Sequence, residues 1–215
     1  MAASNFILWL HGSGGAGPTK EHIQDFFTAD EFRATTWSFP SAPNIPVTFN
    51  SGAIQSSWFD TYEMPITAHS LQDEGGLLNA VQSVHTILDK EIASGTNRNN
   101  VFVCGFSQGG ALGLASVLLY PKSLGGCAVF SGWNPLKHSV LDPITPDAKK
   151  TPILWQHGIY DKDVLFEAGQ AGSSFITKAG MSCEFKAYAS LDHSINNEEF
   201  HLLESWIKTR LQSSS

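Results

Sequence analysis

A serine flanked by glycines is the strongest chemical signal in this chain. Ser107 lies between Gly105 and Gly109, after the apolar run Val101–Cys104 and before an apolar helical pattern. A G-x-S-x-G run at a strand-to-helix turn is typical of a nucleophilic serine that projects above a sheet. Glycines are needed on both sides because side chains would collide in so tight a turn. We predict that Ser107 is a nucleophile and that the N–H of Gln108 faces a developing oxyanion.

Two later loops offer the acid and the base that such a serine needs. Asp161 follows the strand-like run Ile153–Gln156, and His193 follows the run Glu184–Tyr188. The order Ser, Asp, His along the chain is typical of α/β-hydrolases. We expect His193 to take the serine proton and Asp161 to orient the imidazole. Asp163 remains an alternative acid.

A glycine-rich loop follows the first strand-like run and begins Leu10-His11-Gly12-Ser13. Such a loop suits the second half of an oxyanion hole, because its backbone N–H groups are free to face a substrate. We predict that the N–H of Ser13 is the second donor. His11 precedes the nucleophile and adjoins a strand, so we expect it to be structural.

The same loop also fits the G-x-G-x-x-G pattern of dinucleotide-binding proteins, through Gly12, Gly14 and Gly17. That alternative requires an acidic residue at the end of the next strand to bind a ribose hydroxyl. The next strand-like run, Thr35–Pro40, ends without one. The dinucleotide hypothesis is therefore the weaker of the two.

These residues need a sheet that brings several strand ends to one edge. Short apolar runs alternate with amphipathic segments, which predicts an α/β-hydrolase fold with a mostly parallel central sheet and helices on both faces. We expect one domain over residues 1–215, with a frayed tail at 211–215. Prolines break the segments 39–66 and 132–152, which are expected to form small loop lids over the carboxyl ends of the strands. The strand candidates are Phe6–Leu10, Val101–Cys104, Gly126–Phe130 and Ile153–Gln156, with Val47–Phe49 and Glu184–Tyr188 weaker.

Composition narrows the class of partner. With 13 Lys and Arg against 20 Asp and Glu, the net charge is −7, which argues against nucleic acid and anionic membrane surfaces. The apolar stretch near the N-terminus is too short for a signal peptide or a membrane span, so no stable membrane insertion and a cytoplasmic location are expected. Three scattered cysteines and eight histidines show no metal spacing, and no cofactor is predicted.

With these segments in place, the chain resembles the acyl-protein thioesterase and carboxylesterase family of small α/β-hydrolases, in its plant-like branch. The resemblance implies hydrolysis of esters or thioesters through an acyl-serine, on an acylated protein or a small substrate. It assigns the nucleophile, acid and base to Ser107, Asp161 and His193, and the oxyanion donors to Ser13 and Gln108. The motifs that carry it are Leu10-His11-Gly12, Ser57-Trp58-Phe59-Asp60, Asp73-Glu74-Gly75, the run Gly105–Ala111, the segment Leu124–Ser131, His157-Gly158 with Asp161, and His193-Ser194.

The chain departs from that family where the substrate pocket is expected. Gln55 stands where depalmitoylating members place Met, and Asp163 stands where they carry an apolar side chain in the acyl channel. Met64, Ile66 and Trp133 are candidates for the rest of an apolar wall. A buried unpaired carboxylate is costly, and a long chain would lose contact for each unburied methylene. We therefore expect short acyl groups to be favoured over palmitate.

Two other activities remain open within this family. Plant relatives include protein deacetylases, so acetyl-lysine is one alternative substrate. A long-chain protein depalmitoylase or lysophospholipase is another. The sequence leaves the oligomeric state open.

Overall fold

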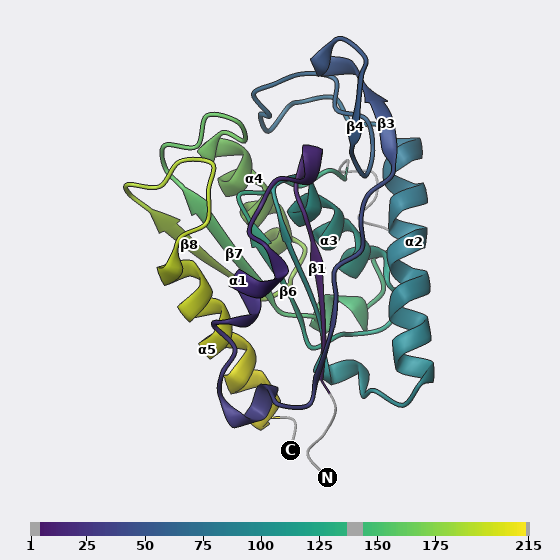
Figure 1. Cartoon of the computed structure of the whole chain (residues 1–215), viewed down its shortest axis with the longest axis vertical. Coiled ribbons are helices and arrows are strands. Elements are labelled where there is room, and N and C mark those ends of the chain that lie inside the picture. The colour runs from purple at the N-terminus through teal and green to yellow at the C-terminus, as the bar shows by residue number, and fades with distance from the viewer. Residues whose placement is uncertain (1–4, 137–143, 214–215) are drawn as a thin grey trace.

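The central sheet has six parallel strands in the order β2-β1-β5-β6-β7-β8 (Figure 1). The computed structural model describes residues 5–136 and 144–213. The α/β-hydrolase fold predicted from the sequence is confirmed. The strands are β1 (Asn5–Leu10), β2 (Thr35–Ser38), β5 (Val101–Phe106), β6 (Gly126–Phe130), β7 (Ile153–Gly158) and β8 (Cys183–Tyr188).

Helices cover both faces of this sheet. Helices α2 (Glu74–Ala93), α3 (Gln108–Leu119) and α4 (Phe166–Lys178) share one hydrophobic core with the sheet. Helices α1 (Lys20–Gln24) and α5 (Asn197–Ser213) pack into a second core on the other face. In the described part of the chain, no helix combines the length and apolar character that crossing a bilayer requires.

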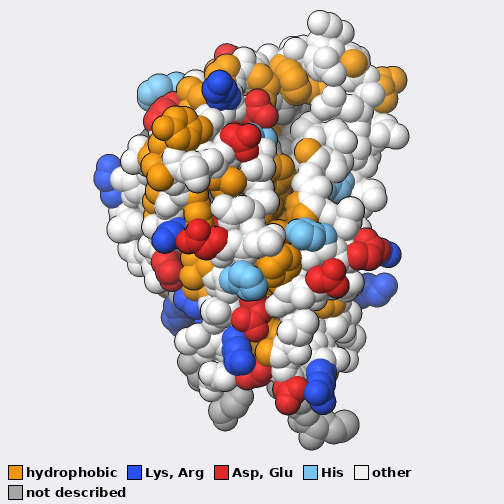
Figure 2. Space-filling view, turned by 60° about the vertical axis from the view of Figure 1, so that its left-hand side comes forward, with side chains coloured by type: hydrophobic (Ala, Val, Ile, Leu, Met, Phe, Trp, Pro, Cys, Tyr) orange, Lys and Arg blue, Asp and Glu red, His pale blue; other side chains and the backbone are white. Residues whose placement is uncertain are grey.

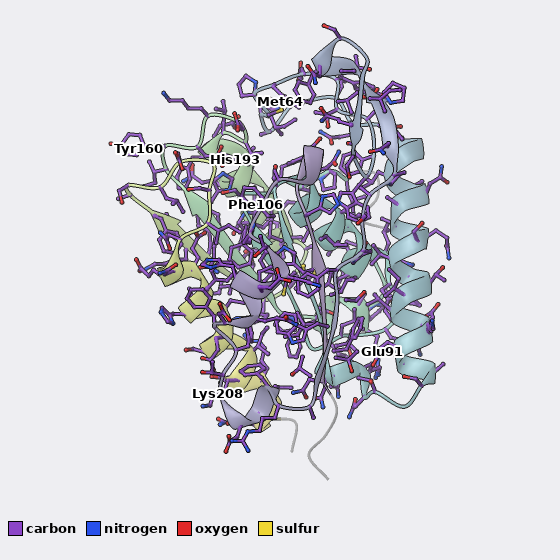
Figure 3. The ribbon with its side chains drawn as sticks, in the orientation of Figure 1. Met64, Glu91, Phe106, Tyr160, His193 and Lys208 are labelled. Carbon is purple, nitrogen blue, oxygen red and sulfur yellow. The ribbon has the colours of Figure 1, made fainter. Side chains whose placement is uncertain are left out.

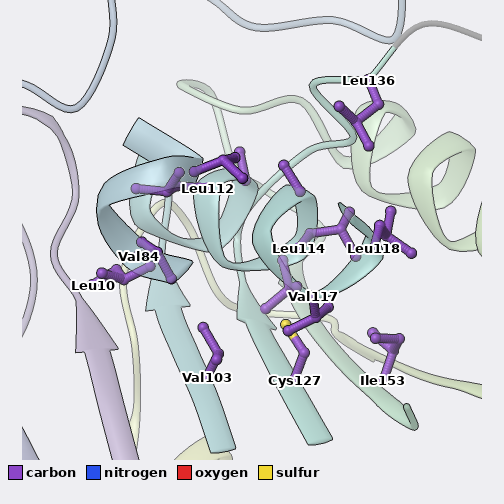
Figure 4. Packing of buried hydrophobic residues seen from close by; sticks show 14 of the residues in the cluster. Leu10, Val84, Val103, Leu112, Leu114, Val117, Leu118, Cys127, Leu136 and Ile153 are labelled. Carbon is purple, nitrogen blue, oxygen red and sulfur yellow. The ribbon is translucent and has the colours of Figure 1, made fainter. Parts of the chain in front are cut away.

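Helix α3 is apolar nearly all round because it is buried on every side. Leu112, Leu114 and Val117 are fully buried in the core that α3 shares with β5, β6 and α2 (Figure 4). Burying each such side chain contributes about 1.5–3 kcal/mol. This packing fixes the N-terminal end of α3 at the carboxyl edge of the sheet.

The segment 39–66 contains a short hairpin that the sequence did not indicate. Strands β3 (Asn44–Val47) and β4 (Ala53–Ser56) pair antiparallel in a separate two-stranded sheet. The strand expected at Val47–Phe49 is wrong, because the chain turns through a 3-10 helix at Thr48–Asn50. A two-stranded sheet tolerates Pro46 within β3, since a strand at an edge does not need every N–H.

Two further expectations are corrected. Within the segment 132–152, the described residues 144–152 do not lie over the carboxyl edge, because they lead into the amino end of β7. Residues 137–143 of this segment lie outside the described residues. Asp147 pairs with Arg98, just before β5, at 2.8 Å. Helix α4 was not foreseen, since its Gly- and Ser-rich sequence has low helix propensity. Leu211, assigned to a frayed tail, is buried in α5.

The glycines around Ser107 are enforced by contact with backbone. A Cβ at Gly105 would lie 2.3 Å from the carbonyl oxygen of Gly109, and one at Gly109 would lie 2.1 Å from that of Leu10. Neither distance is possible for real atoms. The first turn of α3 therefore packs directly on the ends of β1 and β5, and only glycine fits there.

Helix α5 begins with a reciprocal capping pair that buries a carboxyl group. The N–H of Glu199 donates to Asn196 Oδ1 at 3.0 Å, and the N–H of Asn196 donates to Glu199 Oε2 at 2.9 Å. The Glu199 side chain is fully buried. Burial raises its pKa to about 8; the neighbouring Glu198 also raises it, and the Asn196 N–H opposes the shift.

Replacing Gly109 tests the close packing at the serine turn. We expect Gly109→Ala to lower the free energy of unfolding by about 3 kcal/mol or more, because the added methyl has no space. Gly75→Ala is the control: its Cβ would meet only Asp73 Oδ1 at 3.9 Å, and alanine favours the helix by up to about 1 kcal/mol. Urea unfolding measures both, and equal stabilities for the two variants would contradict this account.

Glu199 makes stability depend on pH. Between pH 4.5 and 8 the native state keeps a proton on Glu199 that the unfolded chain releases, so the unfolding free energy falls as pH rises through that interval. We expect Glu199→Gln to flatten this dependence and to exceed the wild type in stability at pH 8–9. Glu63→Gln, at an exposed glutamate outside α5, is the control. Parallel wild-type and Glu199→Gln curves across pH would show that the buried carboxyl does not carry the effect.

Candidate active site

Ser107 occupies a strained turn between β5 and α3. Its backbone angles are φ 54° and ψ −121°, outside the regions that side chains usually adopt. The N–H of Ser107 donates to the carbonyl of Phe130 on β6 at 2.8 Å, and its own carbonyl accepts from Ala111 at 3.0 Å. These bonds and the glycine packing hold the hydroxyl at the carboxyl edge of the sheet.

One histidine joins this hydroxyl to a buried carboxylate. His193 Nε2 lies 2.9 Å from Ser107 Oγ, and its Nδ1 lies 2.7 Å from Asp161 Oδ2. Because the carboxylate accepts a hydrogen bond from Nδ1–H, Nε2 has a free lone pair that can accept a hydrogen bond from the serine hydroxyl. The structure therefore brings together the three side chains that the sequence singled out, and the acid that contacts His193 is Asp161 rather than Asp163.

The Asp161 carboxylate is well supplied with donors. Its Oδ1 accepts the N–H groups of Asp163 at 2.9 Å and Val164 at 2.8 Å. Burial alone raises the pKa of Asp161, but hydrogen bonds from His157 and His193 and from the Val164 backbone outweigh it and hold the pKa well below its ordinary value. The group is thus a carboxylate at neutral pH.

His157 is a second histidine beside this carboxylate, and the sequence analysis predicted no role for it. The ring is fully buried, with Nε2 2.9 Å from the carbonyl of Val164 and 3.4 Å from Asp161 Oδ2. Both neighbours are acceptors, so Nε2 carries the proton. Its position four residues before Asp161, at the end of a buried strand, was a signal that could have indicated this contact.

Two backbone N–H groups near Ser107 are free. Within the described ranges, the N–H groups of Ser13 and Gln108 have no hydrogen-bond acceptor. Ser13 begins a 3-10 turn directly after β1, and Gln108 begins α3. His11 is structural, as expected: its Nε2 accepts the N–H of Ala42 at 3.0 Å and its ring lies against Trp58.

The side chain of Gln108 fastens a second segment to the site. Its Oε1 accepts the N–H of Trp58 at 2.9 Å, and its Nε2 donates to the carbonyl of Phe59 at 2.8 Å. Trp58 Nε1 in turn donates to the carbonyl of His11 at 2.8 Å. The Ser57-Trp58-Phe59-Asp60 motif is thus a brace between the start of α3 and the loop after β1.

An open cleft of about 490 Å³ lies beside His193. Phe106 packs against the His193 ring with centroids 4.8 Å apart, toward the carboxyl ends of the strands, whereas Glu91 and Lys208 lie toward the other end of the molecule (Figure 3). On the face in Figure 2, hydrophobic, acidic and histidine side chains are intermixed. The cleft is lined by Ala16, Gly17, Pro18, His22, Phe106, Asp163, His193, Ser194 and Ile195.

Asp163 lines this cleft, but not in the way that the sequence suggested. Its side chain is exposed rather than buried, so the expected desolvation penalty does not arise. The backbone carbonyl of Asp163 accepts the N–H of Ile66 at 2.7 Å, which joins the loop after β7 to the segment around Ile66.

The other pocket candidates are dispersed. Met64 is 40% exposed, whereas Ile66 is buried and paired with Val164. Trp133 lines a separate cavity of about 330 Å³ whose lining includes none of the three linked side chains. Gln55 is half-buried on β4 and contacts Ser13. Neither the cavity at Trp133 nor the cleft beside His193 is lined by Met64 or Ile66, so an apolar wall built from these residues stays a prediction.

The described residues give little support to dinucleotide binding or to a metal site. The helix after the glycine-rich loop, α1, has five residues, and β2 ends at Ser38 without an acidic residue for a ribose. Within residues 5–136 and 144–213, no three His, Cys, Asp or Glu side chains are grouped to hold a metal ion.

Comparison with known proteins shows the family to which the chain belongs. Residues 1–211 match the Phospholipase/Carboxylesterase family model. A probable carboxylesterase of Oryza sativa subsp. japonica is 61% identical over 210 residues, which cover 98% of this chain and 79% of the relative. The crystal structure of Arabidopsis thaliana SOBER1 is 58% identical, with a TM-score of 0.94, covering 97% of this chain and 100% of that one. That of Zea mays acyl-protein thioesterase 2 is 26% identical, with a TM-score of 0.83 and coverage of 98% and 95%.

The family model spans nearly the whole chain, and the relatives align over most of their own length. The chain therefore belongs to the phospholipase/carboxylesterase family of α/β-hydrolases and is a carboxylic ester hydrolase.

Proposed function

We propose that this hydrolase cleaves carboxylic esters or thioesters through an acyl intermediate on Ser107, with His193 as general base and Asp161 as its partner. The observation that carries the proposal is the continuous chain of contacts, 2.9 Å from Ser107 Oγ to His193 Nε2 and 2.7 Å from His193 Nδ1 to Asp161 Oδ2. The free N–H groups of Ser13 and Gln108 support it as donors to an oxyanion.

In the first half of the reaction, Ser107 Oγ attacks the acyl carbon while its proton passes to His193 Nε2. The carbonyl oxygen gains the electron pair and is held by the two backbone N–H groups. The intermediate collapses to an acyl-serine, and the leaving alcohol or thiol takes the proton from His193. Asp161 remains ionised and stabilises the imidazolium.

In the second half, water attacks the acyl-serine. His193 Nε2 removes a proton from the water, and the same two N–H groups again hold the oxyanion. Collapse releases the carboxylic acid and returns the proton to Ser107 Oγ. The substrate and one water molecule supply all the atoms of the two products, so the two halves balance.

We also propose that short acyl groups are favoured. The cleft beside His193 is open and edged by the exposed Asp163 carboxylate and by His22. The distal methylenes of a long chain would lie against these polar groups or in water, and each loses about 0.8 kcal/mol of transfer energy. The apolar side chains around Trp133 line a separate cavity that His193 does not line.

Labelling by a fluorophosphonate probe tests the nucleophile. We expect the wild type to be labelled and Ser107→Ala to lose both labelling and esterase activity, by a factor of about 10³ or more. Ser116→Ala is a matched control, because Ser116 is a fully buried serine on the same helix whose Oγ has no partner among the described residues. Wild-type labelling of Ser107→Ala would refute the proposed mechanism.

An acyl-length series tests the second proposal. With p-nitrophenyl esters from C2 to C16, we expect kcat/KM to be highest at C2–C8 and to fall for longer chains. The same series on thioesters shows whether the preference follows the acyl group or the leaving group. If C12–C16 esters outpace C2–C8, a long-chain depalmitoylase or lysophospholipase activity takes the place of the short-acyl proposal.

A further inference from the structure

The loop that carries Ser13 has little to hold it from within. Gly14, Gly15 and Gly17 all have positive φ, and they are exposed. The loop's own hydrogen bonds run from Gly12 N–H to the Ala16 carbonyl at 2.6 Å, from Gly15 N–H to the Gly12 carbonyl at 3.1 Å and from Ala16 N–H to the Ser13 carbonyl at 3.3 Å. The last of these holds the Ser13 carbonyl, but none of the three holds the Ser13 side chain.

A side chain from the β3–β4 hairpin supplies that restraint. Gln55 Nε2 on β4 donates to Ser13 Oγ at 2.8 Å. The amide has a second contact, because its Oε1 accepts Asn50 Nδ2 at 3.1 Å within the same hairpin. The hydroxyl of Ser13 is therefore bonded to a hairpin side chain that lies 42 residues away in sequence.

We propose that Gln55 is a positioning residue for the oxyanion hole, acting through the Ser13 hydroxyl to aim the Ser13 N–H. This inference rests on the proposed function, in which Ser13 N–H receives the oxyanion. A backbone donor is effective only within about 2.7–3.1 Å of the developing charge, so a loop of glycines needs an outside anchor. Gln55 does not touch the reacting atoms, and a side chain without an amide would leave Ser13 Oγ without this donor.

A double-mutant cycle tests the coupling. We expect Gln55→Met and Ser13→Ala each to lower kcat by about tenfold, less than the ~10²–10³ lost with a whole donor, because the Ser13 N–H remains in both. KM should change less than twofold. The double variant should fall no further than either single variant, since both remove the same hydrogen bond.

The affinity for an oxyanion-forming inhibitor separates positioning from a general structural defect. The Ki of an alkyl trifluoromethyl ketone, which adds to the serine as a charged hemiketal, should rise by the same factor by which kcat/KM falls. Ile54→Ala, on the adjacent and 74% exposed residue of the same strand, is the control and should leave both values unchanged. Ser13→Ala leaves the hairpin intact and tests the inference even if Gln55→Met folds poorly.

The outcomes distinguish this inference from the proposed function. Wild-type kcat and Ki in Gln55→Met or Ser13→Ala, with Ser107→Ala inactive, would overturn only the role of Gln55. Additive losses in the double variant would also overturn it, because Gln55 would then act by another route. Activity that persists in Ser107→Ala would remove the proposed function itself.

Discussion

The close packing of glycine backbone at the start of α3 is the constraint on which the site depends. Gly105 and Gly109 allow the helix to approach β5 and β1 at distances that no side chain permits. Ser107 is thereby held at φ 54°, a conformation with a real energetic cost that the surrounding core offsets. The burial of α3 in the core supplies that offset. The stability of this core therefore determines whether the serine hydroxyl stays in its strained position.

Hydrogen-bond donors around Asp161 keep this buried carboxylate ionised. Two backbone N–H groups and the imidazoles of His157 and His193 surround its two oxygens. The resulting negative charge favours the Nδ1–H tautomer of His193 and leaves Nε2 ready to accept a proton. The loop after β7 thus favours this tautomer of His193 in the absence of substrate.

The hairpin β3–β4 and the brace at Ser57–Asp60 connect parts of the site that are far apart in sequence. Gln108 bonds to the brace, the brace bonds to His11, and Gln55 bonds to Ser13. Both oxyanion candidates are therefore contacted by one stretch of chain: Gln55 on β4 bonds to Ser13, and the segment that follows β4 bonds to Gln108. Most of these contacts pair a side chain with backbone, which restrains loops that contribute little to the core.

The sequence by itself determined the sheet, the serine turn and the order of acid and base, because these follow from local patterns: apolar periodicity, glycine spacing and loops at strand ends. Tertiary structure decided between Asp161 and the alternative Asp163 as the contact of His193, left Asp163 exposed, and brought His157 to Asp161 and Gln55 to Ser13. Those outcomes depend on the direction of side chains in loops and on partners dozens of residues away. Local periodicity carries no information about such contacts, which only the packed chain brings together.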